Sequence, residues 1–217
     1  PAVPEDTRDI AGWMETQITA SLSRLGASRL YALLLHNPVQ MHGPRAEAIA
    51  AALATMADRG LARRVGVSIQ HPDTDLPAIL AHMDPGLIQS PFNLIDDALV
   101  RNGWATRLRR AGCRIHARSA FLQGLLVMPD ADRPAWFDRW SGHWREWRRW
   151  LEAEGLTAPE ACLRFVLSQP DIDCCVAGVD TPAQLAELLS AGDAPLRALP
   201  AWPSPPDSDL ITPFLWK

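Results

Sequence analysis

The opening segment of the chain has helical periodicity. Its apolar residues recur at intervals of three or four positions and so share one helix face: Ile10, Met14, Ile18, Leu22 and Leu25. Gly26 supplies a C-terminal stop. The next apolar run, Leu30 to Leu35, is short, continuous and closed by His36-Asn37-Pro38, which is typical of a strand buried on both faces.

The same alternation continues along most of the chain. It predicts helices over residues 45–59, 75–82, 98–111, 157–168 and 181–190, and strands over residues 64–68, 87–90, 113–118 and 173–176. Two helices begin with a capping box, Thr157 with Glu160 and Thr181 with Gln184. From Arg197 onwards proline is frequent and periodicity is lost, so an irregular surface strap is expected.

Strands that alternate with helices predict an α/β fold with a parallel sheet, either doubly wound or closed into a barrel. The chain has no G-x-G-x-x-G turn, which argues against the doubly wound dinucleotide fold. We therefore expect a (β/α)8 TIM-type barrel with about five of its eight strand-helix units present. The expected domain is single, over 1–217, with barrel units at 1–196 and a tail at 197–217. Because five strands are predicted where a closed barrel needs eight, we expect about three units to be absent from the front of this sequence, which begins at Pro1.

Composition excludes several classes of protein. The chain is 47% hydrophobic and 21% charged, which is enough to bury a core, and its net charge is -4. That charge gives no reason to expect nucleic acid or an anionic membrane as the partner. No apolar run approaches the roughly 18 residues of a membrane span, so a cytoplasmic protein is expected.

The cysteines and four scattered histidines, His71, His82, His116 and His143, are expected to be structural. Cys113, Cys162, Cys174 and Cys175 lack the spacing of a zinc site, and we expect reduced, mostly buried thiols with no bridge between the adjacent pair.

Polar residues that close the apolar runs are the first candidates for chemistry, because barrel sites form at the C-terminal ends of the strands. Each has an alternative explanation as a simple hydrogen-bonding partner, but five occur in register. They are His36, Ser68, Gln89, the pair Arg118-Ser119, and the segment Gly178 to Thr181.

Five stretches of the chain, in matching order, resemble the aldo-keto reductase family. They are SLSRLGASRLYALLLHNP, RRVGVSIQ, IQSPFNL, ARSAFLQGLL and AGVDTPAQLAELL. The resemblance covers strands four to eight of that family's barrel. It implies an oxidoreductase that transfers a hydride between NAD or NADP and a carbonyl or aldose substrate.

The resemblance also implies roles for individual residues. His36 matches the catalytic histidine that polarises the substrate carbonyl, although a structural histidine at the barrel rim is the alternative. Ser68 and Gln89 match the residues that bind the nicotinamide carboxamide, and Arg118 stands where a ring-stacking residue is found. The remaining matches contact the pyrophosphate (Ser119, Phe121 and Gln123) or the adenosine end (Gly178, Val179, Asp180, Gln184 and Glu187).

Departures from the family pattern bear on cofactor choice and activity. Asp180 and Gln184 stand where NADP-dependent members carry basic residues, so we expect NAD to be favoured. Ile69 and Leu188 replace asparagines and should weaken dinucleotide binding. No residue matches the family's catalytic aspartate, tyrosine and lysine, and the only tyrosine, Tyr31, lies within a predicted strand. We expect the isolated chain to be nearly inert, and a degenerate barrel that binds a ligand or partner without catalysis is the alternative.

A tryptophan-rich segment interrupts the alternation. Its indoles are spaced to form one helical stripe, interleaved with arginines, at Trp136, Trp140, Trp144, Trp147 and Trp150. Core packing is the favoured interpretation, while a lid over the cofactor and an exposed interaction surface are the alternatives. For partners we expect a small carbonyl substrate, no nucleic acid, no membrane, and either self-association or pairing with an N-terminal part of the barrel.

Overall fold

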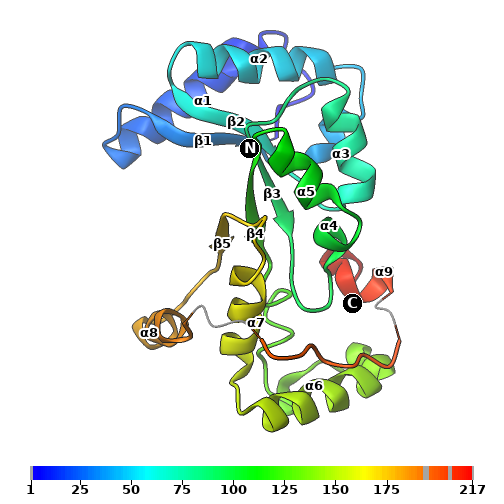
Figure 1. Cartoon of the computed structure of the whole chain (residues 1–217). Coiled ribbons are helices and arrows are strands. Elements are labelled where there is room, and N and C mark those ends of the chain that lie inside the picture. Colours follow the sequence, from blue (N-terminus) through cyan, green and yellow to red (C-terminus); the bar gives the residue numbers. More distant parts are fainter. Residues whose placement is uncertain (1, 193–195, 205–206, 217) are drawn as a thin grey trace. The chain divides into compact units, whose positions relative to one another are not determined.

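The structure is a computed structural model that describes residues 2–192, 196–204 and 207–216. The chain divides into two compact units (Figure 1). The first comprises Pro1–Ser90 and Ala98–His116, and the second comprises Pro91–Asp97 and Ala117–Lys217. The predicted single domain over 1–217 stays a prediction, and each unit is described by itself.

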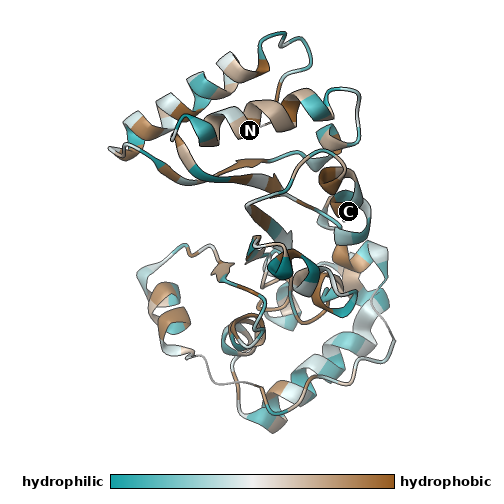
Figure 2. Ribbon diagram, turned by 45° about the horizontal axis from the view of Figure 1, so that its top comes forward, coloured by the Kyte–Doolittle hydropathy of each residue, from teal (hydrophilic) through white to brown (hydrophobic). Residues whose placement is uncertain are grey.

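The first unit holds most of the sheet and its covering helices. In chain order its elements are α1 (Ile10–Leu25), β1 (Leu30–Leu35), the 3-10 helix η1 (Pro38–Met41), α2 (Ala46–Asp58), β2 (Ala62–Ser68), α3 (Pro72–Leu80), β3 (Leu87–Pro91), α4 (Ala98–Arg101), α5 (Trp104–Arg110) and β4 (Arg114–Arg118). Helices α1 and α2 lie side by side, and hydrophobic residues are interleaved with hydrophilic ones along both (Figures 1 and 2).

The second unit is rich in helix. Its elements are the 3-10 helices η2 (Asp130–Asp132) and η3 (Ala135–Trp140), then α6 (Ser141–Glu154), α7 (Ala158–Leu167), β5 (Cys174–Val176), α8 (Pro182–Ser190), α9 (Ser208–Ile211) and η4 (Pro213–Leu215). Strands β3 and β4 each end in this unit.

The five strands form one sheet in the order β1-β2-β3-β4-β5. The registers of β1 with β2 and of β2 with β3 are parallel. Each strand therefore neighbours the one before it in the sequence, with helical connections between them, and the predicted α/β fold with a parallel sheet is confirmed.

Three predicted boundaries were wrong. The helix predicted over 98–111 is two helices, because Gly103 adopts a left-handed backbone with φ of 78° and separates α4 from α5. The helix predicted over 75–82 begins earlier, at Pro72, a residue whose fixed φ suits a first helical position. Trp136 and Trp140 lie in η3, so only Trp144, Trp147 and Trp150 share the helix α6.

The tail from Arg197 is less irregular than predicted. Asp207 caps α9 by accepting a hydrogen bond from the Leu210 backbone N–H at 3.0 Å. Leu210 and Thr212 are buried, so this part of the tail belongs to the packed structure. Residues 205–206 and 217 of the predicted tail lie outside the described residues.

The tryptophan-rich segment packs into the second unit. Trp140, Trp144, Trp147 and Trp150 are buried, which confirms the core-packing interpretation for these four indoles. Phe137 lies edge-on to the Trp216 ring at 4.9 Å, and Trp147 stacks on Trp150 at 5.4 Å. The segment is therefore an aromatic cluster that contacts the tail through Phe137 and Trp216.

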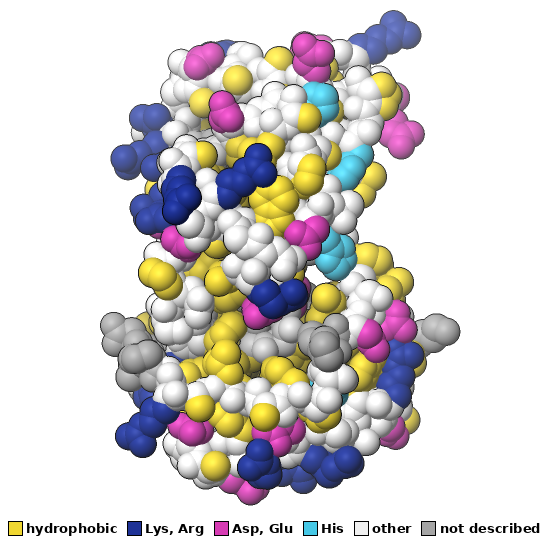
Figure 3. Space-filling model, turned by 45° about the vertical axis from the view of Figure 1, so that its right-hand side comes forward, with side chains coloured by type: hydrophobic (Ala, Val, Ile, Leu, Met, Phe, Trp, Pro, Cys, Tyr) yellow, Lys and Arg dark blue, Asp and Glu magenta, His cyan; other side chains and the backbone are white. Residues whose placement is uncertain are grey.

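The charged surface and the helices bear on other kinds of site. On the face drawn in Figure 3, Lys and Arg side chains are interspersed with Asp and Glu. Within the described ranges, every helix is too short or too polar to cross a membrane. Among the same residues, no group of three or more His, Cys, Asp and Glu side chains is placed to hold a metal ion.

The β2–β3 contact requires glycine at position 66. A Cβ on Gly66 would lie 1.7 Å from the Leu87 carbonyl oxygen, which is backbone and cannot rotate away. Gly66→Ala should therefore lower the free energy of unfolding by at least about 2 kcal/mol. Denaturant unfolding followed by circular dichroism measures the change.

Gly43→Ala is the control for that substitution. A Cβ there would meet only the Gln40 carbonyl oxygen, at 3.9 Å. We expect a change below about 0.5 kcal/mol. Equal stability of the two variants would contradict the close approach of β2 and β3.

The cysteines differ in environment and should differ in reactivity. Cys113 and Cys162 are buried, but Cys174 is exposed, so the prediction of mostly buried thiols was wrong for that residue. Burial raises the pKa of Cys175 to about 11 and raises that of Cys162 well above its usual range. Alkylation requires the thiolate, so at pH 8 iodoacetamide should label Cys174 first. Peptide mass spectrometry of the native chain measures the order, and faster labelling of Cys175 would contradict it.

Candidate functional site

The ends of β2 and β3 bring two predicted cofactor residues together in the first unit. The parallel register sets Ser68 opposite Gln89, and the Ser68 hydroxyl donates a hydrogen bond to Gln89 Oε1 at 3.3 Å. Backbone pairing continues beyond them, from the Ile69 N–H to the Gln89 carbonyl at 2.8 Å. Because the amide oxygen of Gln89 is occupied, its Nε2 group is the donor that it can offer to a ligand.

His36 follows β1 directly and is exposed. A polypeptide bend carries it, and the next residue, Asn37, caps η1 by accepting a hydrogen bond from the Val39 N–H at 3.2 Å. The exposure means that His36 is not a buried core histidine. Its ring can therefore reach a molecule at the C-terminal end of β1.

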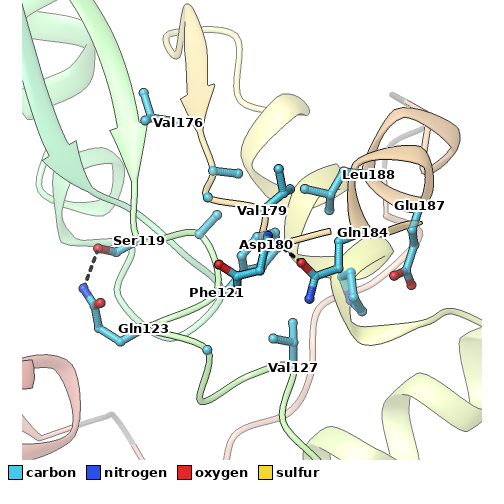
Figure 4. Close-up of a pocket in the computed structure, with 15 residues that line it drawn as sticks. Ser119, Phe121, Gln123, Val127, Val176, Val179, Asp180, Gln184, Glu187 and Leu188 are labelled. Atoms are coloured by element: carbon cyan, nitrogen blue, oxygen red, sulfur yellow. Dashed lines mark hydrogen bonds between the residues drawn. The ribbon is translucent and has the colours of Figure 1, made fainter. Parts of the chain in front are cut away.

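The second unit contains a pocket of about 620 Å³. Two segments form most of its wall, the loop after β4 and the chain from the end of β5 into α8 (Figure 4). Eight of the eleven cofactor-binding residues predicted from the sequence line it: Ser119, Phe121, Gln123, Gly178, Val179, Asp180, Gln184 and Glu187. The other three, Ser68, Gln89 and Arg118, do not line this pocket.

The loop after β4 has an unusual backbone. Ser119, Leu122 and Gln123 have φ values of 56°, 47° and 55°, in the left-handed region that residues other than glycine rarely adopt. Backbone strain of this kind persists only where the surrounding structure holds it in place. It is found most often at active sites and ligand-binding sites. Two of these three residues, Ser119 and Gln123, are predicted cofactor residues that line the pocket.

The Ser119 hydroxyl is positioned to donate a hydrogen bond to a ligand. Its oxygen accepts hydrogen bonds from Arg118 Nη1 at 3.1 Å and from Gln123 Nε2 at 3.5 Å, the latter drawn in Figure 4. With both contacts made to the oxygen, the hydroxyl proton remains for a ligand acceptor. Burial lowers the pKa of the Arg118 guanidinium from its usual value, while nearby Asp96 opposes that shift. A hydroxyl donor beside a guanidinium suits an anionic oxygen.

The opposite wall of the pocket is acidic. Gln184 Oε1 accepts from the backbone N–H groups of Asp180 at 2.7 Å and Thr181 at 3.2 Å, which completes the predicted capping box of α8. The amide oxygen of Gln184 thus caps the helix, whereas the family resemblance assigns this side chain to the adenosine end of the cofactor. The carboxylates of Asp180 and Glu187 are exposed residues of the same wall.

Several residues of the site have no signal in the sequence. Val127, Pro159 and Val176 also line the pocket, and nothing in their types suggested it. Asn93 is fully buried, and its Nδ2 donates to the Ser119 carbonyl at 3.2 Å. The position of Asn93 shortly after a predicted strand is a signal for a role, since polar residues that follow the strands are the candidates for chemistry in such a fold.

The donors and the dimensions of the pocket fit a phosphate-bearing ligand of nucleotide size. Its volume lies within the range of small-molecule sites, and it combines apolar contacts from Phe121, Val127 and Val179 with few polar groups. The Ser119 hydroxyl is the donor within the lining, and the Arg118 guanidinium, which does not itself line the pocket, donates to the oxygen of that hydroxyl. The residues present therefore fit the diphosphate part of a dinucleotide.

Comparison with solved structures finds the same fold in aldo-keto reductases. The aldo-keto reductase AKR11C1 from Bacillus halodurans superposes with a TM-score of 0.67 at 18% identity, covering 95% of this chain and 68% of its own. The thermostable aldo-keto reductase Tm1743, solved with the inhibitor epalrestat, gives a TM-score of 0.62 at 20% identity, covering 93% of this chain and 65% of its own. This chain thus spans about two-thirds of the length of these structures.

Sequence comparison supplies the family. No curated protein matches the chain significantly. The sequence profile described as the Aldo/keto reductase family, however, matches residues 3–198, which is most of the chain. The resemblance read from the five sequence stretches is thereby confirmed, and the chain belongs to the aldo/keto reductase family.

Proposed function

We propose that the protein is an oxidoreductase that transfers a hydride between a nicotinamide dinucleotide and a carbonyl or aldose substrate. The observation that carries the proposal is the pocket of the second unit, which gathers eight of the eleven predicted cofactor residues. The family resemblance assigns these eight residues to the pyrophosphate and the adenosine end of the cofactor. Membership of an oxidoreductase family supports the same reaction class.

The Ser68–Gln89 pair is proposed to bind the nicotinamide carboxamide. The hydrogen bond from Ser68 to Gln89 Oε1 fixes the orientation of the Gln89 amide, which then presents Nε2 to a carbonyl oxygen. A bound reduced nicotinamide supplies the hydride, and the carboxamide contact decides which ring face is offered. The pair acts by orientation, which is one of the larger contributions to a bimolecular transfer.

His36 is proposed to donate a hydrogen bond to the substrate oxygen that gains charge as the hydride arrives. Its exposure at the C-terminal end of β1 supports the role. Tyr31 is poorly placed to act with it as proton donor, because the two residues are five positions apart along extended chain, roughly 16 Å. Tyr31 instead stacks on His116 at 6.0 Å. We therefore propose that these 217 residues alone are nearly inert in turnover.

The separation between Tyr31 and His36 favours a second candidate function. A chain that binds the dinucleotide but has no tyrosine within reach of His36 would be a ligand-binding module without catalysis. Both candidates share the pocket, and they differ only in turnover.

NAD is the proposed cofactor. The adenosine wall carries Asp180 and Glu187, and among the residues that the structure describes no basic side chain lines the pocket. A 2'-phosphate would be repelled by these carboxylates, whereas ribose hydroxyls can donate hydrogen bonds to them. The small-molecule carbonyl partner, the cytoplasmic location and self-association remain proposals. Exposed apolar residues on α8, Leu185 and Leu189, support self-association.

Cofactor choice is tested by calorimetric titration of the chain with NADH and NADPH. NADH should bind at least as tightly as NADPH because of the charge of the adenosine wall. Glu187→Gln removes one carboxylate and should improve NADPH binding by roughly two- to fivefold, with little change for NADH.

Glu152→Gln is the matched control for that variant. Glu152 is exposed on α6 and does not line the pocket, so neither cofactor should respond to its change. A clear preference of the unaltered chain for NADPH would contradict NAD selectivity. Failure to bind either dinucleotide would contradict the proposed function as a whole.

His36→Ala tests the catalytic role in a form of the protein that reduces an aldehyde. We expect kcat/KM to fall by roughly one to three powers of ten, about 1.4 to 4 kcal/mol of transition-state stabilisation. NADH affinity should barely change, because the imidazole is assigned to the substrate oxygen. Oxidation of NADH, followed by absorbance, gives the rate.

His82→Ala serves as the control. His82 is also exposed in the first unit, but it precedes β3 and so lies toward the opposite end of the parallel strands. Its loss should leave kcat/KM unchanged. Equal turnover by the His36→Ala variant would return His36 to a structural role, and binding without any turnover by the unaltered protein would favour the ligand-binding module.

A further inference from the structure

The segment Ser119–Val127, named here the pocket loop, needs support from outside itself. Three of its residues other than glycine have left-handed backbones, and such residues persist only where their surroundings hold them. Its internal hydrogen bonds are short-range, such as Leu122 N–H to the Ser119 carbonyl at 2.9 Å and Leu126 N–H to the Phe121 carbonyl at 3.2 Å. Contacts of this kind do not fix where the loop lies relative to the rest of the unit.

A buried asparagine holds the start of the pocket loop. The Nδ2 group of Asn93 donates to the Ser119 carbonyl at 3.2 Å. Its Oδ1 atom accepts from the backbone N–H groups of Ile95 and Asp96, both at 2.9 Å. Since the residue is completely buried, each of these bonds is expensive to lose. Asn93 therefore joins the turn after β3 to Ser119, which lines the pocket.

A buried tryptophan holds the end of the loop. The indole Nε1 of Trp147, on α6, donates to the Leu126 carbonyl at 2.9 Å. Trp147 and Leu126 are both buried, so water cannot replace either partner. The tryptophan-rich segment, which the proposed function does not use, thus reaches the backbone of the pocket wall.

The tail links the two supports. The Trp202 indole donates to the Leu94 carbonyl at 3.1 Å, one residue after Asn93, and its ring lies 6.1 Å from that of Trp147. His143 stacks on Trp202 at 5.9 Å from the same helix as Trp147. Both ends of the pocket loop are therefore connected through one aromatic cluster.

We propose that Asn93 and Trp147 are positioning residues for the dinucleotide, acting through the pocket loop. Neither side chain lines the pocket, and each holds a carbonyl of the loop that does. The inference rests on the proposed function, because it assigns the loop to dinucleotide binding. It assigns to the tryptophan-rich segment the role of supporting the pocket loop.

The chain offers a matched control for Trp147. Trp150 is buried on the same helix and stacks on Trp147 with an interplanar angle of 13°. Within the described part of the chain its Nε1 atom has no hydrogen-bond partner. Replacing either tryptophan with phenylalanine removes the same volume, but only Trp147→Phe removes a hydrogen bond to the pocket loop.

The experiment compares these two variants with the unaltered chain in two measurements. Hydrogen exchange of the free protein should show faster exchange for amides of residues 119–128 in Trp147→Phe than in Trp150→Phe. Calorimetric titration with NADH should show affinity weakened roughly three- to tenfold in Trp147→Phe and little changed in Trp150→Phe.

Asn93→Asp provides a second, independent variant. It keeps the oxygen that accepts from Ile95 and Asp96 but loses the Nδ2 donor, so it should also speed exchange at residues 119–122 and weaken NADH binding. Global melting is recorded for all variants, and affinities are compared only where the protein is folded.

Distinct outcomes separate the inference from the proposed function. If the unaltered chain binds NADH and both tryptophan variants bind equally well, the positioning role is overturned and the proposed function stands. If faster exchange appears without any loss of NADH affinity, the loop is supported but not for binding, which also overturns the inference. If the unaltered chain binds no NADH, the proposed function fails and the inference fails with it.

Discussion

The parallel register of β2 against β3 is the constraint on which the first unit depends. It places Gly66 opposite Leu87 and Ser68 opposite Gln89. Glycine at position 66, where a Cβ would lie 1.7 Å from a backbone oxygen, permits the strand approach in which the Ser68 hydroxyl reaches the Gln89 amide. A residue without a side chain thereby sets the geometry of two side chains that are proposed to bind a carboxamide.

In the second unit the corresponding constraint is a strained loop. Left-handed residues at Ser119 and Gln123 turn polar groups toward the pocket, and that conformation is disfavoured by itself. Buried hydrogen bonds to the loop carbonyls, from Asn93 and Trp147, offset the cost. The packing of the aromatic cluster around Trp147 therefore helps to hold the pocket loop in its conformation.

The sequence predicted the order and type of most elements, because apolar periodicity and capping residues act locally. It also predicted eight of the residues that line the pocket, through the family resemblance. It could not predict the split of the helix at Gly103, since an isolated glycine is tolerated within a helix unless its φ becomes positive. Nor could it predict α9, whose four residues are too few to show periodicity.

Contacts between distant residues explain what else was missed. The bond from Trp147 to Leu126 spans 21 positions and that from Asn93 to Ser119 spans 26, so no local pattern records them. Tryptophan spacing correctly indicated burial, but spacing says nothing about where an indole N–H points. The burial of the tryptophans could therefore be predicted from their spacing, whereas the contact of Trp147 with the pocket loop could not.

Gln184 has two predicted roles, one as a helix cap and one as a cofactor contact. The Thr181–Gln184 pair was predicted as a capping box, and Gln184 was also matched to a family position that contacts the adenosine end. Its Oε1 atom accepts from two backbone N–H groups at the start of α8, so the amide is held in place by the helix that it caps. An amide engaged in this way has only its Nε2 group left for a ligand. The proposed preference between NAD and NADP therefore rests on the carboxylates of Asp180 and Glu187, whose charge a 2'-phosphate would meet on the same wall of the pocket.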